Sequence, residues 1–381
     1  MSLESRISSM LEKINEPFHV DRWVEKNILG LDSNADVSSW RDTQLMRDSA
    51  HFGVALLGEA VGVARMGPGW VREIVRNGIY PDHMTHRKLR YLPENADLNM
   101  LKRENPEWIF REGFNPEEMV FVFLHGYIDN TGADRVAFKL ASLGYQVYAV
   151  RYPFLRSVDK LAEELADSLE AIYRKEKGKK LIPIGHSLGG FVWDQLLHSH
   201  PDLVEKYNMP LYIPMGSPHY GTLVARIGPG QSARQMQANS DMVKFNLSKR
   251  FHQNLELYPF VSRFDMLVIP IETALLKSGI NYLFTETGHL GQVVKNETVC
   301  AIEEIISTPK SILLERAQHR EFYLSSFTRL LSKLPKGAQK KLGVDGVFDY
   351  LGLDDEPTKF HMRIVHHEIR LGLMPTLKRS Q

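Results

Sequence analysis

The chain has 381 residues, 43% of them hydrophobic, and a formal net charge of +1. This composition can supply a large buried core, and the nearly neutral charge argues against general nucleic-acid binding, which needs a basic face. The single cysteine, Cys300, excludes an internal disulfide and fits a reducing compartment. The first residues lack an apolar run of signal-peptide length, so we expect a cytoplasmic protein.

Residues 1–116 show a mainly helical pattern punctuated by turn signals, and they carry no chemical motif. We expect a helical N-terminal extension that either wraps the rest of the protein or supplies its first strands near residues 88–92.

An apolar strand over residues 118–124 runs into His125-Gly126-Tyr127. A glycine turn at this place is suited to presenting backbone N–H groups to an oxyanion, which needs two preorganised donors. We assign the two donors to the backbone N–H groups of Tyr127 and of Leu188. The alternative is an ordinary glycine turn between strand and loop.

Strands and helices alternate along the next hundred residues. The apolar patterns predict helices over 133–143 and 158–175 and strands over 146–151, 181–184 and 211–215. This alternation predicts an α/β fold with a mostly parallel central sheet covered by helices on both faces.

Ser187 lies in Gly185-His186-Ser187-Leu188-Gly189, between a buried strand and a helix pattern. Glycines two residues before and after a serine allow a strained corner that projects the hydroxyl outward at a helix N-terminus. We interpret Ser187 as a nucleophile; the alternative is a chance turn.

The stretch after residue 215 contains the turn Gly216-Ser217-Pro218-His219-Tyr220-Gly221 and then a long insertion. His219 is interpreted as a structural or pocket-lining residue. Residues 221–258 interrupt the alternation, and so long a connection predicts either a helical cap or a mobile lid. Met236 and Met242 supply apolar side chains to this segment, either as the lining of a binding site beneath it or as part of helices packed permanently on the core.

A general base and its orienting acid should follow Ser187 along the chain. Asp265 stands at the edge of an apolar stretch expected to be a strand, and His289 stands in a glycine-flanked loop after a strand over 281–284. We assign His289 as the base and Asp265 as its partner. Glu272 and Glu286 are competing acids.

Residues 308–381 predict a helical C-terminal extension with a cluster of lysines at 333–341. That cluster indicates a solvated helix face or, alternatively, attraction to an anionic membrane surface. The spacing of His361, His366 and His367 does not favour a metal site, and we expect neither a metal nor a cofactor.

Together these motifs resemble the lipase and esterase branch of the α/β-hydrolase superfamily, and the Gly-Ser-Pro-His-x-Gly turn resembles that of bacterial triacylglycerol lipases. The resemblance covers about residues 118–307. It implies a hydrolase core over 117–307 with a cap or lid at 221–258, between helical extensions at 1–116 and 308–381. It also implies a substrate-binding region that includes five residues: His125, His186, His219, Met236 and Met242.

The expected activity is hydrolysis of a carboxylic ester with an apolar acyl chain through an acyl-enzyme on Ser187. An acyl-ester or lipid is the expected substrate, with possible transient contact with a membrane surface and no nucleic-acid partner. The alternatives are an acyl thioesterase or acyltransferase that uses the same triad, and a non-catalytic lipid-binding or partner-binding protein.

Overall fold

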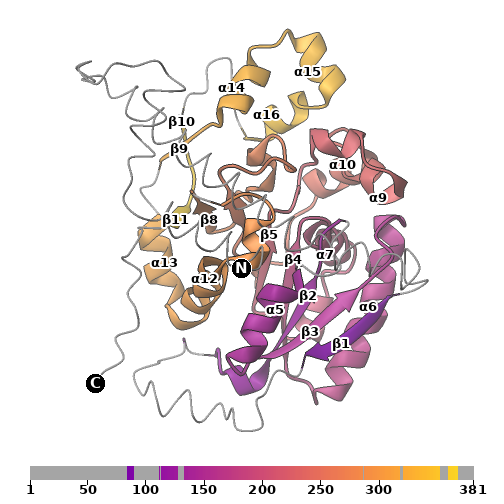
Figure 1. Ribbon diagram of the computed structural model, residues 1–381, viewed down its shortest axis with the longest axis vertical. Helices are drawn as coiled ribbons and strands as arrows, with labels where there is room; N and C mark the ends of the chain where they lie inside the picture. The colour runs from indigo at the N-terminus through magenta and orange to yellow at the C-terminus, as the bar shows by residue number, and fades with distance from the viewer. Residues whose placement is uncertain are drawn as a thin grey trace, which may run out of the picture. The chain divides into compact units, whose positions relative to one another are not determined.

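A nine-stranded sheet forms the centre of the part of the chain that the computed structural model describes, which is residues 84–89, 111, 113–127, 133–285, 287–317, 321–351 and 359–367 (Figure 1). The strand order is β1-β3-β2-β4-β5-β7-β8-β11, with β6 paired to β5. Only β1 runs antiparallel to its neighbour in this sheet; the other pairs are parallel. The strands are β1 (Thr85–Leu89), β2 (Met119–Leu124), β3 (Gln146–Arg151), β4 (Lys180–His186), β5 (Leu211–Met215), β6 (Glu256–Leu257), β7 (Phe260–Ser262), β8 (Asn281–Phe284) and β11 (Ile364–His367).

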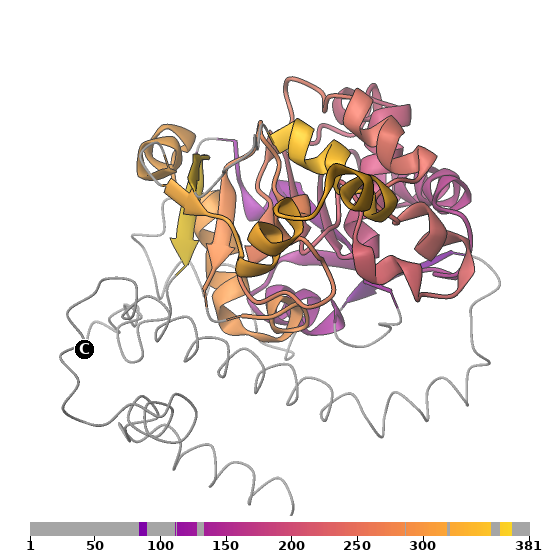
Figure 2. The ribbon, with the colours of Figure 1, turned by 90° about the horizontal axis from the view of Figure 1, so that it is seen from above.

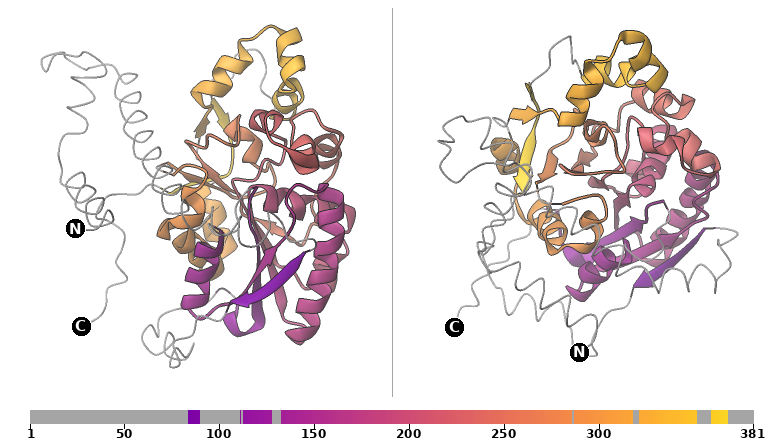
Figure 3. Two further views of the ribbon diagram at one scale, coloured as in Figure 1. Left: turned by 45° about the vertical axis from the view of Figure 1, so that its right-hand side comes forward. Right: turned by 45° about the horizontal axis from the view of Figure 1, so that its top comes forward.

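Helices cover both faces of the sheet, and the strand sequences show why. Side chains alternate between the faces of a strand, and every residue of β2 is buried. Val120, Val122 and Leu124 belong to one apolar cluster, whereas Phe121 and Phe123 belong to a second. The first cluster includes side chains of α6 (Val158–Lys175) and α7 (Leu188–Ser199), and the second those of α5 (Ala133–Ser142) and α12 (Asn296–Ser307). In the left view of Figure 3 the sheet lies between α5 and α12 on one side and α6 on the other. The expected α/β fold class is therefore confirmed.

The insertion at 221–258, which we call the cap, is helical and packed on the core. It contains η2 (Leu223–Arg226), α9 (Gly230–Gln235) and α10 (Asp241–Ser248). Met236 and Met242 are buried in the same cluster as α6 and α7. Their helices therefore have the packed arrangement that was one of the two expectations for this segment.

The C-terminal region differs from the structure expected for it. It was expected to be a helical extension beyond residue 307, but β11 pairs with β8 in the central sheet, and β9 (Glu321–Tyr323) pairs with β10 (Lys359–His361). Its helices are α13 (Lys310–Ala317), α14 (Ser326–Ser332), α15 (Lys336–Leu342) and α16 (Asp345–Leu351). Val344 and Phe348 are buried in the same cluster as α6 and α7, so the segment with α14–α16 completes the core.

At the other end of the chain, β1 joins the sheet from within the expected N-terminal extension, near the residues proposed for a first strand. The rest of that extension, apart from Met84, Arg111 and residues 113–116, lies outside the described residues. Within the described ranges, no helix has both the length and the apolar character needed to cross a bilayer.

Candidate active site

The loops that carry the candidate residues meet at one edge of the sheet, because the carboxyl ends of parallel strands share an edge. His125-Gly126-Tyr127 follows β2, Ser187 follows β4, and Gly216 follows β5. Asp265 comes shortly after β7, and His289 comes shortly after β8.

Ser187 stands at a sharp corner between β4 and α7 with a positive φ of 53° and ψ of −119°. A non-glycine residue rarely takes this conformation, which is the strained corner expected from the flanking glycines. A Cβ atom on Gly185 would lie 2.5 Å from the backbone nitrogen of Gly190, and one on Gly189 would lie 2.4 Å from the carbonyl oxygen of Leu124. The two glycines are required because strand and helix approach so closely here.

The turn expected to form the oxyanion hole lies against this corner. A Cβ atom on Gly126 would lie 3.1 Å from Ser187 Cβ and 2.8 Å from His186 Nδ1. Leu188 is the first residue of α7, and amide groups in the first turn of a helix have no acceptor within that helix. The backbone of Tyr127 and that of Leu188 therefore come from two segments that flank the Ser187 corner. The Tyr127 hydroxyl donates to the carbonyl of Pro229 in the cap.

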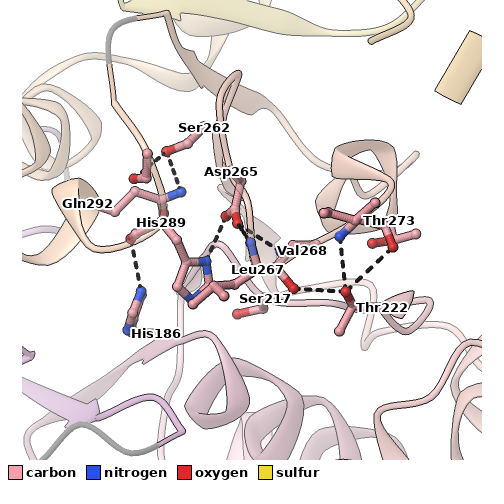
Figure 4. A network of polar contacts seen from close by, with 12 residues as sticks. His186, Ser217, Thr222, Ser262, Asp265, Leu267, Val268, Thr273, His289 and Gln292 are labelled. Atoms are coloured by element: carbon pink, nitrogen blue, oxygen red, sulfur yellow. Dashed lines mark hydrogen bonds and ion pairs between the residues drawn. The ribbon is translucent and has the colours of Figure 1, made fainter. Parts of the chain in front are cut away.

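His289 and Asp265 form a buried pair, with His289 Nδ1 2.7 Å from Asp265 Oδ2 (Figure 4). The two side chains are 3% and 2% exposed, so water hardly reaches the contact. The other carboxylate oxygen of Asp265 accepts the backbone N–H groups of Leu267 and Val268, each at 2.8 Å. These bonds hold the carboxylate in a turn, which corrects the expectation of a strand at this point: the strand β7 lies just before Asp265.

The His289–Asp265 pair lies close to the Ser187 corner. The contacts that show this involve the end of β5 and His186. Ser187 donates its backbone N–H to Met215 at 2.8 Å, and a Cβ atom on the next residue, Gly216, would lie 3.2 Å from His289 Nδ1. The rings of His186 and His289 have centroids 4.6 Å apart. The structure thus brings Ser187, His289 and Asp265 to the same place at the end of β5.

Two polar residues that the sequence did not single out hold the His289 loop. Gln292 is fully buried and donates to Ser262 Oγ at 2.6 Å, and Ser262 donates to the carbonyl of Gly288 at 3.2 Å. Figure 4 shows this chain of contacts beside the His289–Asp265 pair. A Gln three residues after a candidate histidine is too common a pattern to have drawn attention to either residue.

Glu272 and Glu286 are the two acids that could compete with Asp265. Glu272 in η3 (Ile271–Ala274) accepts bonds from Ser325 and Thr328, so its carboxylate is engaged with α14. Its complete burial raises the pKa of this carboxyl, although these donors act in the opposite direction. Glu286 lies outside the described residues.

The five residues expected to bind substrate are all buried, in different surroundings. His125 stacks on Tyr152 with ring centroids 4.2 Å apart, and His186 lies against His289. His219 does not join them: its Nδ1 lies 2.5 Å from Asp194 of α7. Met236 and Met242 belong to the apolar cluster that also contains Leu188.

The sheet order, the serine corner between a strand and a helix, and the order Ser, Asp, His along the chain identify the fold class. The fold is that of an α/β-hydrolase. Among the described residues, no group of three or more histidine, cysteine or carboxylate side chains is arranged to hold a metal ion.

No family model and no curated protein sequence matches the chain. Solved structures are similar to it at low identity. A lipase from Bacillus licheniformis in its mature form is 18% identical, with a TM-score of 0.41, over 51% of this chain and 95% of that one. A monoacylglycerol lipase from Paleococcus ferrophilus is 15% identical, with a TM-score of 0.40, over 59% and 98%. A phospholipase from Legionella pneumophila is 16% identical, with a TM-score of 0.33, over 38% and 39%.

Proposed function

We propose that the protein is a serine hydrolase that cleaves carboxylic esters with apolar acyl chains. The proposal rests on one observation: the strained Ser187 corner and the buried His289–Asp265 pair lie together at the end of β5. A serine hydroxyl is a weak nucleophile unless a base oriented by a third group takes its proton, and these residue types supply that set.

In the proposed reaction, Ser187 Oγ attacks the ester carbonyl carbon while His289 accepts the hydroxyl proton. Asp265 orients the imidazole and stabilises its protonated form. The backbone N–H groups of Tyr127 and Leu188 donate to the oxyanion. Collapse of the tetrahedral intermediate breaks the bond between the carbonyl carbon and the alcohol oxygen, and His289 gives its proton to the departing alcohol.

A water molecule then attacks the acyl-enzyme, with His289 again acting as the base. The acid leaves and the Ser187 hydroxyl is restored, so the cycle needs no cofactor. The apolar cluster that joins Leu188 to Met236 and Met242 supports an apolar acyl group as the substrate's acyl portion. His125 and His186 adjoin the serine corner and are proposed to line the same region.

The test is labelling with a fluorophosphonate probe together with turnover of nitrophenyl acyl esters of increasing chain length. We expect a single adduct on Ser187, and we expect Ser187→Ala to abolish both labelling and turnover while remaining folded. Ser217→Ala is the matched control, because this buried serine stands in the neighbouring turn and donates to the carbonyl of Gly185. Equal turnover by Ser187→Ala, or an adduct elsewhere, would refute the assignment.

A parallel panel of acyl thioesters and acceptor alcohols separates ester hydrolysis from thioester hydrolysis and acyl transfer. We expect the oxygen esters to give the highest kcat/KM. A folded protein that neither takes the probe nor turns over any of these substrates would instead be a binding protein with this fold.

A further inference from the structure

Exposed apolar side chains are concentrated on one part of the surface. Seven large apolar side chains are exposed among the described residues, and two of them, Phe138 and Ile312, lie on α5 and α13. The other five lie on three segments: Ile227 on the cap, Met266 and Leu267 on residues 263–270, which we call the acid loop, and Phe327 and Leu330 on α14.

Hydrogen bonds join these three segments to one another. Thr222 of the cap donates to the carbonyl of Leu267 at 2.8 Å, and Leu223 donates its N–H to Ile269 at 2.9 Å. Arg226, which precedes Ile227, donates to the carbonyl of Lys341 at the end of α15 at 2.6 Å. The cap is thus bonded both to the acid loop and to the segment with α14–α16.

Glu272 makes the third connection. It lies two residues beyond the acid loop and accepts the backbone N–H of Ser325 at 2.7 Å and the hydroxyl of Thr328. Ser325 is the N-cap residue of α14, so the carboxyl of Glu272 fixes the start of this helix against the acid loop. The five exposed apolar side chains are therefore carried by three hydrogen-bonded segments, one of which contains Asp265. Figure 2 looks down on them, with the yellow segment α14–α16 nearest the viewer.

The helix α14 has one side buried against the core and one side exposed to solvent. Thr328 and Leu331 are buried, whereas Phe327 and Leu330, three residues apart on one face, are 44% and 59% exposed. Ile227 is 86% exposed. Apolar side chains scattered singly need no explanation, but five on three hydrogen-bonded segments indicate a surface that contacts an apolar phase or a partner.

The charged side chains on the same segments indicate the kind of partner that this surface would bind. Residues 326–351 contain five basic and two acidic side chains. The exposed basic residues on α14 and its C-cap, on α15 and beside Ile227 are Arg226, Arg329, Lys333, Lys336, Lys340 and Lys341. Apolar side chains flanked by lysines and arginines suit the interface of an anionic bilayer, where the former enter the acyl boundary and the latter pair with headgroups.

We propose that the cap, the acid loop and the α14–α16 segment form a docking surface for anionic lipid membranes. The inference rests on the proposed function, because the purpose of docking would be to present lipid esters to the candidate triad. Asp265 of that triad lies in the acid loop. Docking itself requires no turnover and can be measured without it.

The experiment uses full-length Ser187→Ala protein, which leaves the lipid intact, and vesicles of phosphatidylcholine with or without phosphatidylglycerol. We expect cosedimentation with the anionic vesicles, weakened by salt. Lys336→Gln, Lys340→Gln and Lys341→Gln combined should lower the partition coefficient on the order of 100-fold, because each lysine near an anionic surface contributes about a factor of five.

The second variant replaces the apolar stripe with Phe327→Ser and Leu330→Ser, and we expect a loss of roughly tenfold or more. Phe138→Ser and Ile312→Ser are the matched controls, since these side chains are exposed to a similar degree on other helices. Circular dichroism melts check that each variant is folded.

Failure of the active protein to turn over nitrophenyl esters would refute the proposed function but not the docking surface. The docking surface is overturned if the Ser187→Ala protein ignores anionic vesicles, as it would if another segment or a second copy covered this surface. It is also overturned if folded lysine and apolar variants bind as tightly as the controls.

Discussion

Two buried histidine–aspartate pairs lie in the described part of the chain, and they differ in surroundings more than in geometry. His289 and Asp265 meet at 2.7 Å, and His219 and Asp194 meet at 2.5 Å. The first pair joins two loops at the carboxyl edge of the sheet. The second joins the turn after β5 to the middle of α7, where the hydroxyl of Tyr212 also lies 3.0 Å from Asp194.

Position relative to Ser187 separates the two pairs. Asp194 stands seven residues beyond Ser187, about 10 Å further along the helix axis. The same Tyr212 hydroxyl lies 2.7 Å from the carbonyl of Gly190, so the second pair braces the first turns of α7. A buried imidazole and carboxylate in contact therefore do not by themselves identify a base. We propose a base only where the pair also lies close to a candidate nucleophile, as the His289 pair lies close to Ser187 across Met215 and Gly216.

The largest effect that tests this comparison is expected at the first pair. His289→Ala should reduce kcat on a nitrophenyl ester by about 10⁴-fold or more, and Asp265→Asn by about 10⁴-fold, because the serine loses its oriented base. Steady-state kinetics and thermal melts on the same preparations measure both properties. Near-normal turnover by folded His289→Ala would mean that another group accepts the proton.

The matching change at the second pair should act on stability. His219→Ala leaves the buried Asp194 carboxylate without its imidazole, which should lower the free energy of unfolding by about 3 kcal/mol. Urea denaturation measures the loss, and the folded fraction should keep far more activity than His289→Ala does. A large drop in kcat without a loss of stability would move His219 into the reaction.

A smaller effect is expected from Tyr212→Phe, which keeps the ring and removes only the hydroxyl between Gly190 and Asp194. The expected cost is about 1 kcal/mol of unfolding free energy, typical of one net hydrogen bond. Tyr207→Phe is the control, since its hydroxyl bonds to Glu170 near the surface. An equal loss of unfolding free energy in both variants would mean that the Tyr212 hydroxyl stabilises the protein no more than a hydroxyl near the surface does.

The smallest effect concerns Glu272, a third buried acid, whose described contacts are to Ser325 and Thr328 rather than to a histidine. Because burial raises its pKa above the ordinary 4.5, the folded protein holds this proton more tightly than the unfolded chain. The stability it contributes is fully present below pH 4.5 and is lost as pH rises through the raised pKa. Melting temperatures across this range should therefore fall less steeply for Glu272→Gln than for the unmodified protein, and parallel curves would contradict the assignment.

Most of the sheet could be predicted because its central strands are short, mostly apolar and separated by turn residues. The strands at 146–151, 211–215 and 281–284 have the expected bounds, as has the helix at 158–175. The corner at Ser187 could be predicted because the close approach of strand and helix permits only glycines two residues before and two residues after this serine.

The parts that could not be predicted depend on contacts between distant segments. Residues 364–367 (IVHH) have too little pattern to indicate a strand, and only the free edge of β8 makes them one. Likewise, nothing near His219 in the sequence indicates that Asp194 is its partner. The pairing of Gln292 with Ser262 also depends on how two loops meet.

The position of β11 at the far end of the sheet has a consequence for how the protein is made. β8, which leads directly into the His289 loop, receives its outer neighbour only from residues 364–367. During synthesis that edge stays open until residues 364–367 have left the ribosome, and an open strand edge invites pairing with other chains. Chaperone protection of the nascent chain would matter most in this interval, after Ser187 has been translated but before the sheet can close.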